Sequence, residues 1–171
     1  MITADTADLD ASLQKFIETA ERKLKNVAKG FAYEFSVFAV GNTPLGEEQK
    51  GPDSTYFNLY QFRTTRKDWQ SYGLEPKEGF ARGAWQVSFD GSLEAQSNYG
   101  QTSGSTALVS IDSTLNRYKL GQTITIGNYG PYIRDLNNGY SEKAPEGISK
   151  PTIDQVLQAY LINVKKYYEA G

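Results

Sequence analysis

The chain has 171 residues, of which 39% are hydrophobic and 22% charged, and its formal net charge is −2. This length suits one domain, 1–171, with one hydrophobic core. It contains no cysteine and no histidine, which excludes disulfides, thiol nucleophiles, imidazole bases and nearly every zinc site. The slightly acidic balance argues against a nucleic-acid clamp, and no apolar run approaches the roughly 20 residues that cross a bilayer.

A long helix is predicted from Asp5 to about Val40. Its apolar residues recur at three- and four-residue spacing, and they are Leu9, Leu13, Phe16, Ile17, Ala20, Leu24, Val27, Ala28, Phe31, Phe35 and Phe38. Aspartates come first and lysines later, the order that the helix dipole favours. Residues 31–40 also alternate as a strand would, but the helical stripe continues across Gly30, so we expect helix throughout.

A polar segment should follow this helix. The sequence Gly41-Asn-Thr-Pro-Leu-Gly46 ends the helix. Residues 47–77 are polar with scattered aromatics, which predicts a long excursion with at most a short strand or edge hairpin. The alternation in Trp85-Gln-Val-Ser-Phe89 then predicts a half-buried strand, and Asp90-Gly91 a turn.

A helix over 105–118 and a strand over 122–126 are expected next. The two strands should pair as a small antiparallel sheet. The expected core residues of this sheet are Trp85, Val87, Phe89, Ile124 and Ile126.

Two further helices complete the predicted fold. A short one should begin at Pro131 and close with a left-handed cap at Asn138-Gly139. The last should start near Thr152, because Thr152 and Gln155 fit a capping box. Its expected buried stripe is Ile153, Val156, Leu157, Tyr160, Leu161 and Val164. The predicted class is α+β, with a long N-terminal helix, a small antiparallel sheet and further helices including a C-terminal helix.

Groups that could carry chemistry are few. A glycosidase would need two carboxylates facing one sugar site. The candidates, all in loop-like regions, are Asp53, Glu75, Glu78, Asp90 and Glu94. Each is explained as simply by a solvated surface charge. The segment 79–83 lacks the residue order of a phosphate-binding loop, and the basic cluster 63–67 fits a solvated or intersubunit patch. We therefore predict no catalytic residue, no cofactor and no metal.

The sharpest polar and aromatic cluster contains Tyr132, Arg134, Asp135 and Tyr140. Two interpretations stay open. Tyr132 could pack the short helix while Arg134 and Asp135 face water. Alternatively, Arg134 and Tyr140 could anchor a subunit contact, since arginine and tyrosine often do so at interfaces.

Two segments resemble motifs of one family. Glu78-Gly-Phe-Ala-Arg-Gly-Ala-Trp-Gln-Val-Ser-Phe89 is similar to the "TGRARGNWQVS" pattern of tailed-bacteriophage neck proteins. The run from Thr123 to Gly147, Thr-Ile-Thr-Ile-Gly-Asn-Tyr-Gly-Pro-Tyr-Ile-Arg-Asp-Leu-Asn-Asn-Gly-Tyr-Ser-Glu-Lys-Ala-Pro-Glu-Gly, is similar to their "ITNNLPYARRLEYGWSKQAPAG". Thr43-Pro44 fits the family's Thr-Pro, whereas residues 45–77 would be an insertion and Glu78-Gly79 replaces Thr-Gly. The family includes the minor tail protein Z type of lambda-like phages, also called tail-completion or head–tail joining proteins.

The resemblance implies a non-enzymatic virion protein at the head–tail junction, made in the host bacterial cytoplasm. Such proteins form rings, here expected to be six- or twelvefold, between the portal-side connector and the tail terminator or tail tube proteins. DNA passes through the ring without specific binding. The residues expected to contact other subunits or rings are Arg82, Trp85, Tyr132, Arg134 and Tyr140.

A small glycan-binding module is the alternative. Aromatics on loops 54–72 and 96–104, among them Tyr56, Trp69 and Tyr99, would then stack on sugars. Binding to a glycan array that is lost when one of these residues becomes alanine would favour this alternative.

Overall fold

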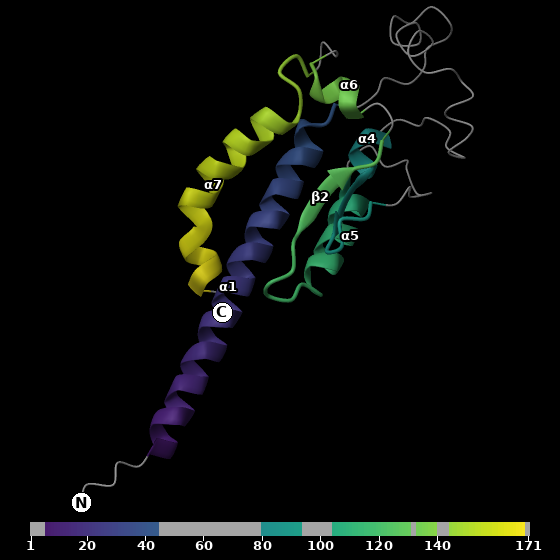
Figure 1. Cartoon of the computed structure of the whole chain (residues 1–171). Coiled ribbons are helices and arrows are strands. Elements are labelled where there is room, and N and C mark those ends of the chain that lie inside the picture. Colours follow the sequence, from purple (N-terminus) through teal and green to yellow (C-terminus); the bar gives the residue numbers. More distant parts are fainter. Residues whose placement is uncertain (1–5, 45–79, 94–103, 131–132, 140–143, 170–171) are drawn as a thin grey trace, which may run out of the picture.

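A computed structural model of the chain describes residues 6–44, 80–93, 104–130, 133–139 and 144–169. The order of its elements is α1, α4, β1, α5, β2, α6 and α7. Helix α1 runs through the middle of the molecule, with α7 along one side and the sheet with α5 along the other (Figure 1). The α+β prediction is confirmed.

Helix α1 extends without interruption from Thr6 to Asn42. The stretch 31–40 is therefore helical and not a strand. Its small residues Ala32, Ser36 and Ala39 are buried and lie on one face of the helix. Thr43 follows the last helical residue, and its backbone N–H still donates to the carbonyl of Ala39 over 3.1 Å. Pro44 follows and lacks the N–H that another turn would need.

The sheet consists of two antiparallel strands, β1 (Trp85–Ser88) and β2 (Thr125–Asn128). Their register pairs Trp85 with Asn128 and Val87 with Ile126. The second strand thus begins three residues later and ends two residues later than the predicted 122–126. Ile124 precedes it while still packing on the core. Phe89 lies just beyond β1, and its ring centroid is 5.8 Å from that of Tyr118.

Helix α5 (Ser105–Leu115) is shorter than the predicted 105–118. Its buried residues Ala107, Ile111 and Leu115 recur every four residues and form one face against α1 and β1. The segment after Leu115 leaves the helix, yet Tyr118 is still buried, which is why the apolar spacing alone overestimated the length.

The short helices also differ in detail from prediction. Helix α4 (Phe80–Gly83) precedes β1, and α6 (Ile133–Asn137) starts after Pro131, which lies outside the described residues. The predicted cap after α6 is confirmed, because Gly139 has a left-handed φ of 75° and its N–H donates to the carbonyl of Leu136.

Helix α7 (Ser149–Glu169) begins three residues before Thr152, so the predicted capping box is wrong. The cap is supplied from elsewhere: Asn137 Oδ1 accepts a hydrogen bond from the backbone N–H of Ser149 over 2.9 Å. Thr152 is instead fully buried, and its Oγ1 accepts a hydrogen bond from Asn42 Nδ2 over 3.0 Å. The side chain that fitted a cap therefore binds α7 to the end of α1.

Helices α1 and α7 are held together by a partly buried polar group. Glu34 Oε1 accepts hydrogen bonds from Tyr167 OH over 2.6 Å and from Asn163 Nδ2 over 2.9 Å. The ring of Tyr167 also covers Gly30, where a larger residue would meet it. Burial raises the pKa of Tyr167 to about 12, and the hydrogen bond to Glu34 adds to the effect.

The hydrophobic core lies between the upper half of α1, the sheet and α5. Its buried members are Ala32, Ala39, Val40, Ala81, Ala84, Trp85, Ile111, Leu115, Leu136 and Ile148. In α7 only Thr152 and Val156 are buried, so most of the predicted stripe on this helix is not part of the core. Among the described residues, no helix is long and apolar enough to cross a membrane.

Candidate assembly interface

The Arg-Gly-Ala-Trp segment and the Thr-Pro segment meet at the upper end of α1. Thr43 is fully buried, and its Oγ1 donates to the carbonyl of Ala39 over 2.7 Å while accepting from Trp85 Nε1 over 2.8 Å. Arg82 Nε donates to the carbonyl of Thr43 over 2.6 Å. These bonds fasten α4 and β1 to the last turn of α1.

Asn128 completes this junction from the second strand. Its Nδ2 donates to the carbonyl of Ala81 over 2.7 Å, and its Oδ1 accepts from the backbone N–H of Gly130 over 2.8 Å. Sequence reasoning missed this residue, although an asparagine at a strand end before Tyr-Gly-Pro is typical of a turn. The junction therefore ties together the two segments that carried the family resemblance.

The residues predicted to contact other subunits fall into three groups. Trp85 is only 7% exposed and belongs to the core of its own chain, so we no longer count it among surface contacts. Arg82 is partly buried in the junction, whereas Arg134 is exposed on α6. Tyr132 and Tyr140 lie outside the described residues, as do Tyr56, Trp69 and Tyr99 of the glycan-binding alternative. Of the predicted cluster, only Arg134 and Asp135 are described, so whether its four members lie together stays a prediction.

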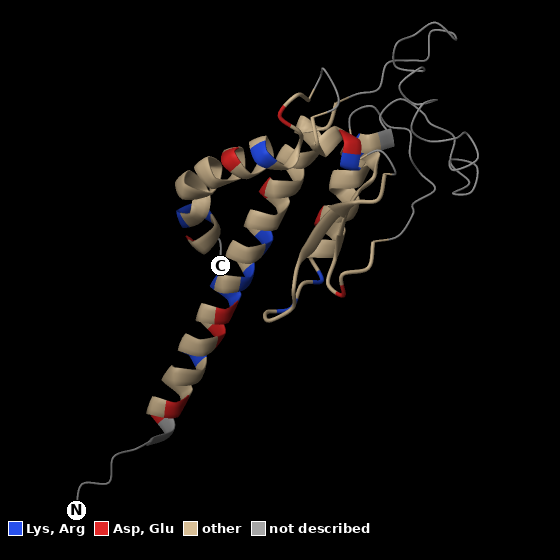
Figure 2. Cartoon of the chain, turned by 45° about the horizontal axis from the view of Figure 1, so that its top comes forward, with Lys and Arg blue, Asp and Glu red and all other residues tan. Residues whose placement is uncertain are grey.

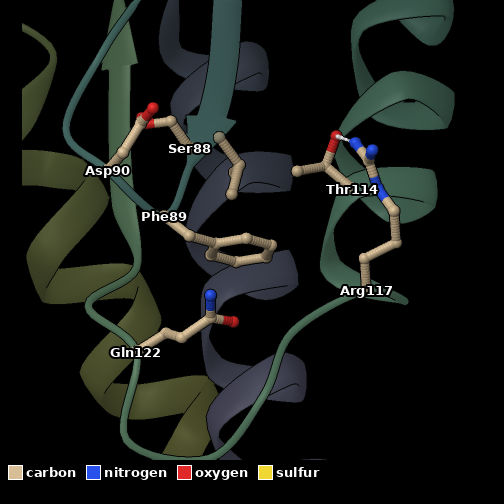
Figure 3. Close-up of a pocket in the computed structure, with 7 residues that line it drawn as sticks. Ser88, Phe89, Asp90, Thr114, Arg117 and Gln122 are labelled. Atoms are coloured by element: carbon tan, nitrogen blue, oxygen red, sulfur yellow. Dashed lines mark hydrogen bonds between the residues drawn. The ribbon is translucent and has the colours of Figure 1, made fainter.

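An open pocket of about 390 Å³ lies beside the end of β1 and the end of α5 (Figure 3). It is lined by Val87, Ser88, Phe89, Asp90, Thr114, Arg117 and Gln122. The ring of Phe89 points into its centre, and Arg117 Nη2 donates to Thr114 Oγ1 over 3.4 Å.

Asp90 is the one proposed acid–base carboxylate within the described residues. It accepts hydrogen bonds from Ser92 Oγ over 2.6 Å and from the Ser92 backbone N–H over 3.0 Å. These bonds hold its pKa below its usual range, which suits a turn and is the opposite of what a general acid needs. The described residues hold no group of three or more potential metal ligands.

One large exposed apolar feature is the first half of α1. We call residues 6–24 the α1 arm, and this arm projects beyond the other described elements (Figure 1). Helix α7 reaches down only to Lys23, whose Nζ lies 4.3 Å from the ring centroid of Tyr168. The exposed apolar side chains of the arm are Leu9, Leu13, Phe16, Ile17 and Leu24, and Phe16 is 71% exposed.

A second exposed apolar feature lies on α7. We call Ile153, Leu157, Leu161 and Tyr168 the α7 ridge, because their spacing places them on one side of the helix. Leu161 is 77% exposed, so half of the predicted buried stripe of α7 lies at the surface. The physical reason is that α7 packs on α1 along one side only.

Charge is mixed along the arm. Figure 2 shows acidic and basic residues interspersed on the lower half of α1, with no large patch of one sign on it. The arm is therefore amphipathic, with a continuous apolar stripe beside charged residues, the pattern of a helix that packs against a partner.

Comparisons of the chain with protein-family models, with curated proteins and with solved structures found no match.

Proposed function

We propose that this protein is a structural subunit of the tailed-phage neck, which forms a ring that joins the DNA-filled head to the tail. The observation that carries the proposal is the α1 arm, whose apolar stripe has no partner within the described chain. A chain that exposes the apolar stripe of a projecting helix is suited to assembly with other chains.

The size of the stripe supports a role in protein contacts. The exposed fractions of its five large side chains correspond to about 500 Å² of apolar surface, in the range at which patches mark interaction sites. Left in water, this stripe would also promote non-specific association. A permanent assembly covers it.

The two resembling segments support the same proposal. They are separated by more than thirty residues in the sequence but lie side by side as β1 and β2. Arg82 of the first segment donates to the carbonyl of Thr43 at the end of α1, and Asn128 of the second donates to the carbonyl of Ala81 in α4. The resemblance therefore concerns one connected part of the fold.

The charge balance is compatible with a DNA conduit. The formal net charge is −2, and a channel that binds its cargo tightly would need a basic excess. Passage of DNA without specific binding requires no such excess. Arg134, exposed on α6, remains a proposed contact to a neighbouring subunit or ring.

The test is removal of the gene from a phage that encodes this chain. Electron microscopy should show separate DNA-filled heads and separate tails, and supplying the chain in trans should restore joined particles. Added to a portal complex, the purified chain should raise the mass measured by mass photometry by six or twelve copies. Joined and infectious particles without the chain would refute the proposal.

A further inference from the structure

We infer that the α1 arm of one copy binds antiparallel along the α7 ridge of a second copy. This inference deepens the proposed function, on which it rests for the repetition of the contact around a ring. Within one chain the α1 arm and the α7 ridge meet only at their ends, where Lys23 lies over Tyr168, because α1 is a single continuous helix whose arm extends past the end of α7.

The spacing of the two surfaces carries the inference. Along the arm the stripe is Leu9, Leu13, Phe16, Ala20 and Leu24, with steps of four, three, four and four residues. Read backward along α7, the matching positions are Tyr168, Val164, Leu161, Leu157 and Ile153, with the same steps in the same order. An antiparallel pair in this register brings each arm position opposite one position of α7.

Length and area agree with this register. Each set covers sixteen residues from first to last, or roughly 22 Å of helix, so neither surface extends past the other. The exposed side chains of the arm and the ridge together present about 1,000 Å² of apolar surface, near the lower limit for a specific interface.

The charges favour the antiparallel direction. Asp8 and Asp10 lie at the start of the arm, and Lys165 and Lys166 lie near the end of α7. The register places Asp10 within one turn of Lys165 in the other copy. The ion pair of Lys165 with Glu169, at 3.7 Å, is exposed and lies within one helix, so Lys165 can turn toward a new partner at little cost.

The arm is inferred to bind the ridge of a second copy, and not a second arm, because of the surfaces that each contact covers. Two arms pairing with each other would close at two copies and leave both α7 ridges exposed. An arm on a ridge covers both surfaces with one contact and leaves each copy able to donate one arm and receive another. Such a heterologous contact generates a ring when its rotation closes.

The test uses the absence of native cysteine in the full chain. One preparation carries Ala20→Cys and a second carries Leu157→Cys, and the two are mixed at millimolar concentration and oxidised. We expect the mixed disulfide between positions 20 and 157 to form about tenfold or more faster than with the matched control Gln158→Cys, which is exposed one residue away. Circular dichroism verifies that each variant is folded.

A second set of variants tests the role of the charges. Asp10→Lys and Lys165→Asp should each slow the 20–157 crosslink, and mixing the two reversed chains should restore it. Equal rates for positions 157 and 158 would overturn the inference, as would a preferred crosslink between Leu13→Cys and Ala20→Cys, which reports two paired arms.

The outcomes separate this inference from the proposed function. A 20–157 crosslink together with joined particles in the absence of the gene leaves the arm contact standing and refutes the neck role. Separate heads and tails together with no preferred crosslink does the reverse.

Discussion

Replacing Thr43 by valine should destabilise the fold strongly, although the two side chains have nearly the same shape. The Oγ1 of Thr43 donates one hydrogen bond and accepts another, from Trp85 Nε1, in a fully buried position. Valine fills the same volume but leaves the indole N–H without this acceptor. Loss of the bonds and desolvation of an orphaned buried donor give an expected loss of about 2–3 kcal/mol in the free energy of unfolding.

A double-mutant cycle isolates the pair. Trp85→Phe alone removes the indole N–H and leaves a small void, and we expect a loss of about 2 kcal/mol or more. The double variant leaves no orphaned donor, so its loss should be smaller than the sum of the single losses by about 1 kcal/mol or more.

The assay is urea unfolding followed by circular dichroism, which does not depend on the tryptophan being replaced. Thr123→Val, at an exposed position, is the matched control and should change stability by less than about 0.5 kcal/mol. Additive losses in the Thr43 and Trp85 cycle would show that the 2.8 Å bond does not hold α1 to β1.

Two further predictions concern pH and backbone conformation. Because the folded chain raises the pKa of Tyr167 to about 12 from 10.0, stability from its bond to Glu34 is fully present below about pH 10 and is lost as the pH rises toward 12. The free energy of unfolding, measured with urea, should be about 1 kcal/mol lower at about pH 11.5 than at about pH 9, since partial exposure of Tyr167 reduces the effect. Tyr167→Phe should remove this part of the pH dependence. Gly139→Ala should lower the free energy of unfolding by about 2 kcal/mol or more, because φ is 75° there and an added Cβ would meet the carbonyl oxygen of Pro145. Gly41 lies inside α1 with open space where a Cβ would be added, so Gly41→Ala should raise the free energy of unfolding by about 0.5–1 kcal/mol in the same urea measurement. A loss of stability in this variant would contradict the reasoning.

Local patterns were sufficient for the elements themselves. The three- and four-residue spacing predicted α1 almost to its ends, and the alternation from Trp85 predicted β1. The glycine after Asn138 predicted the left-handed cap. These signals are reliable because each depends on a few neighbouring residues and on the geometry of one helix turn or one strand.

Boundaries that depend on distant residues were not predictable in the same way. Helix α7 begins at Ser149 because Asn137 accepts from its N–H, and Thr152 is buried against Asn42 instead of capping. The partners lie twelve and more than a hundred residues away. A capping pattern in the sequence gives no information on such competition.

For the candidate interface, the sequence by itself determined that α1 and α7 each carry an apolar stripe. It could not determine which part of each stripe is covered, because periodicity defines a face and not the element that packs on it. Only the tertiary structure decided that Trp85 is internal and that the end of α7 lies beside Lys23 of α1. It also decided that Phe16 and Leu161 remain exposed. Burial depends on where distant helices end in space, and this is settled when the whole chain packs.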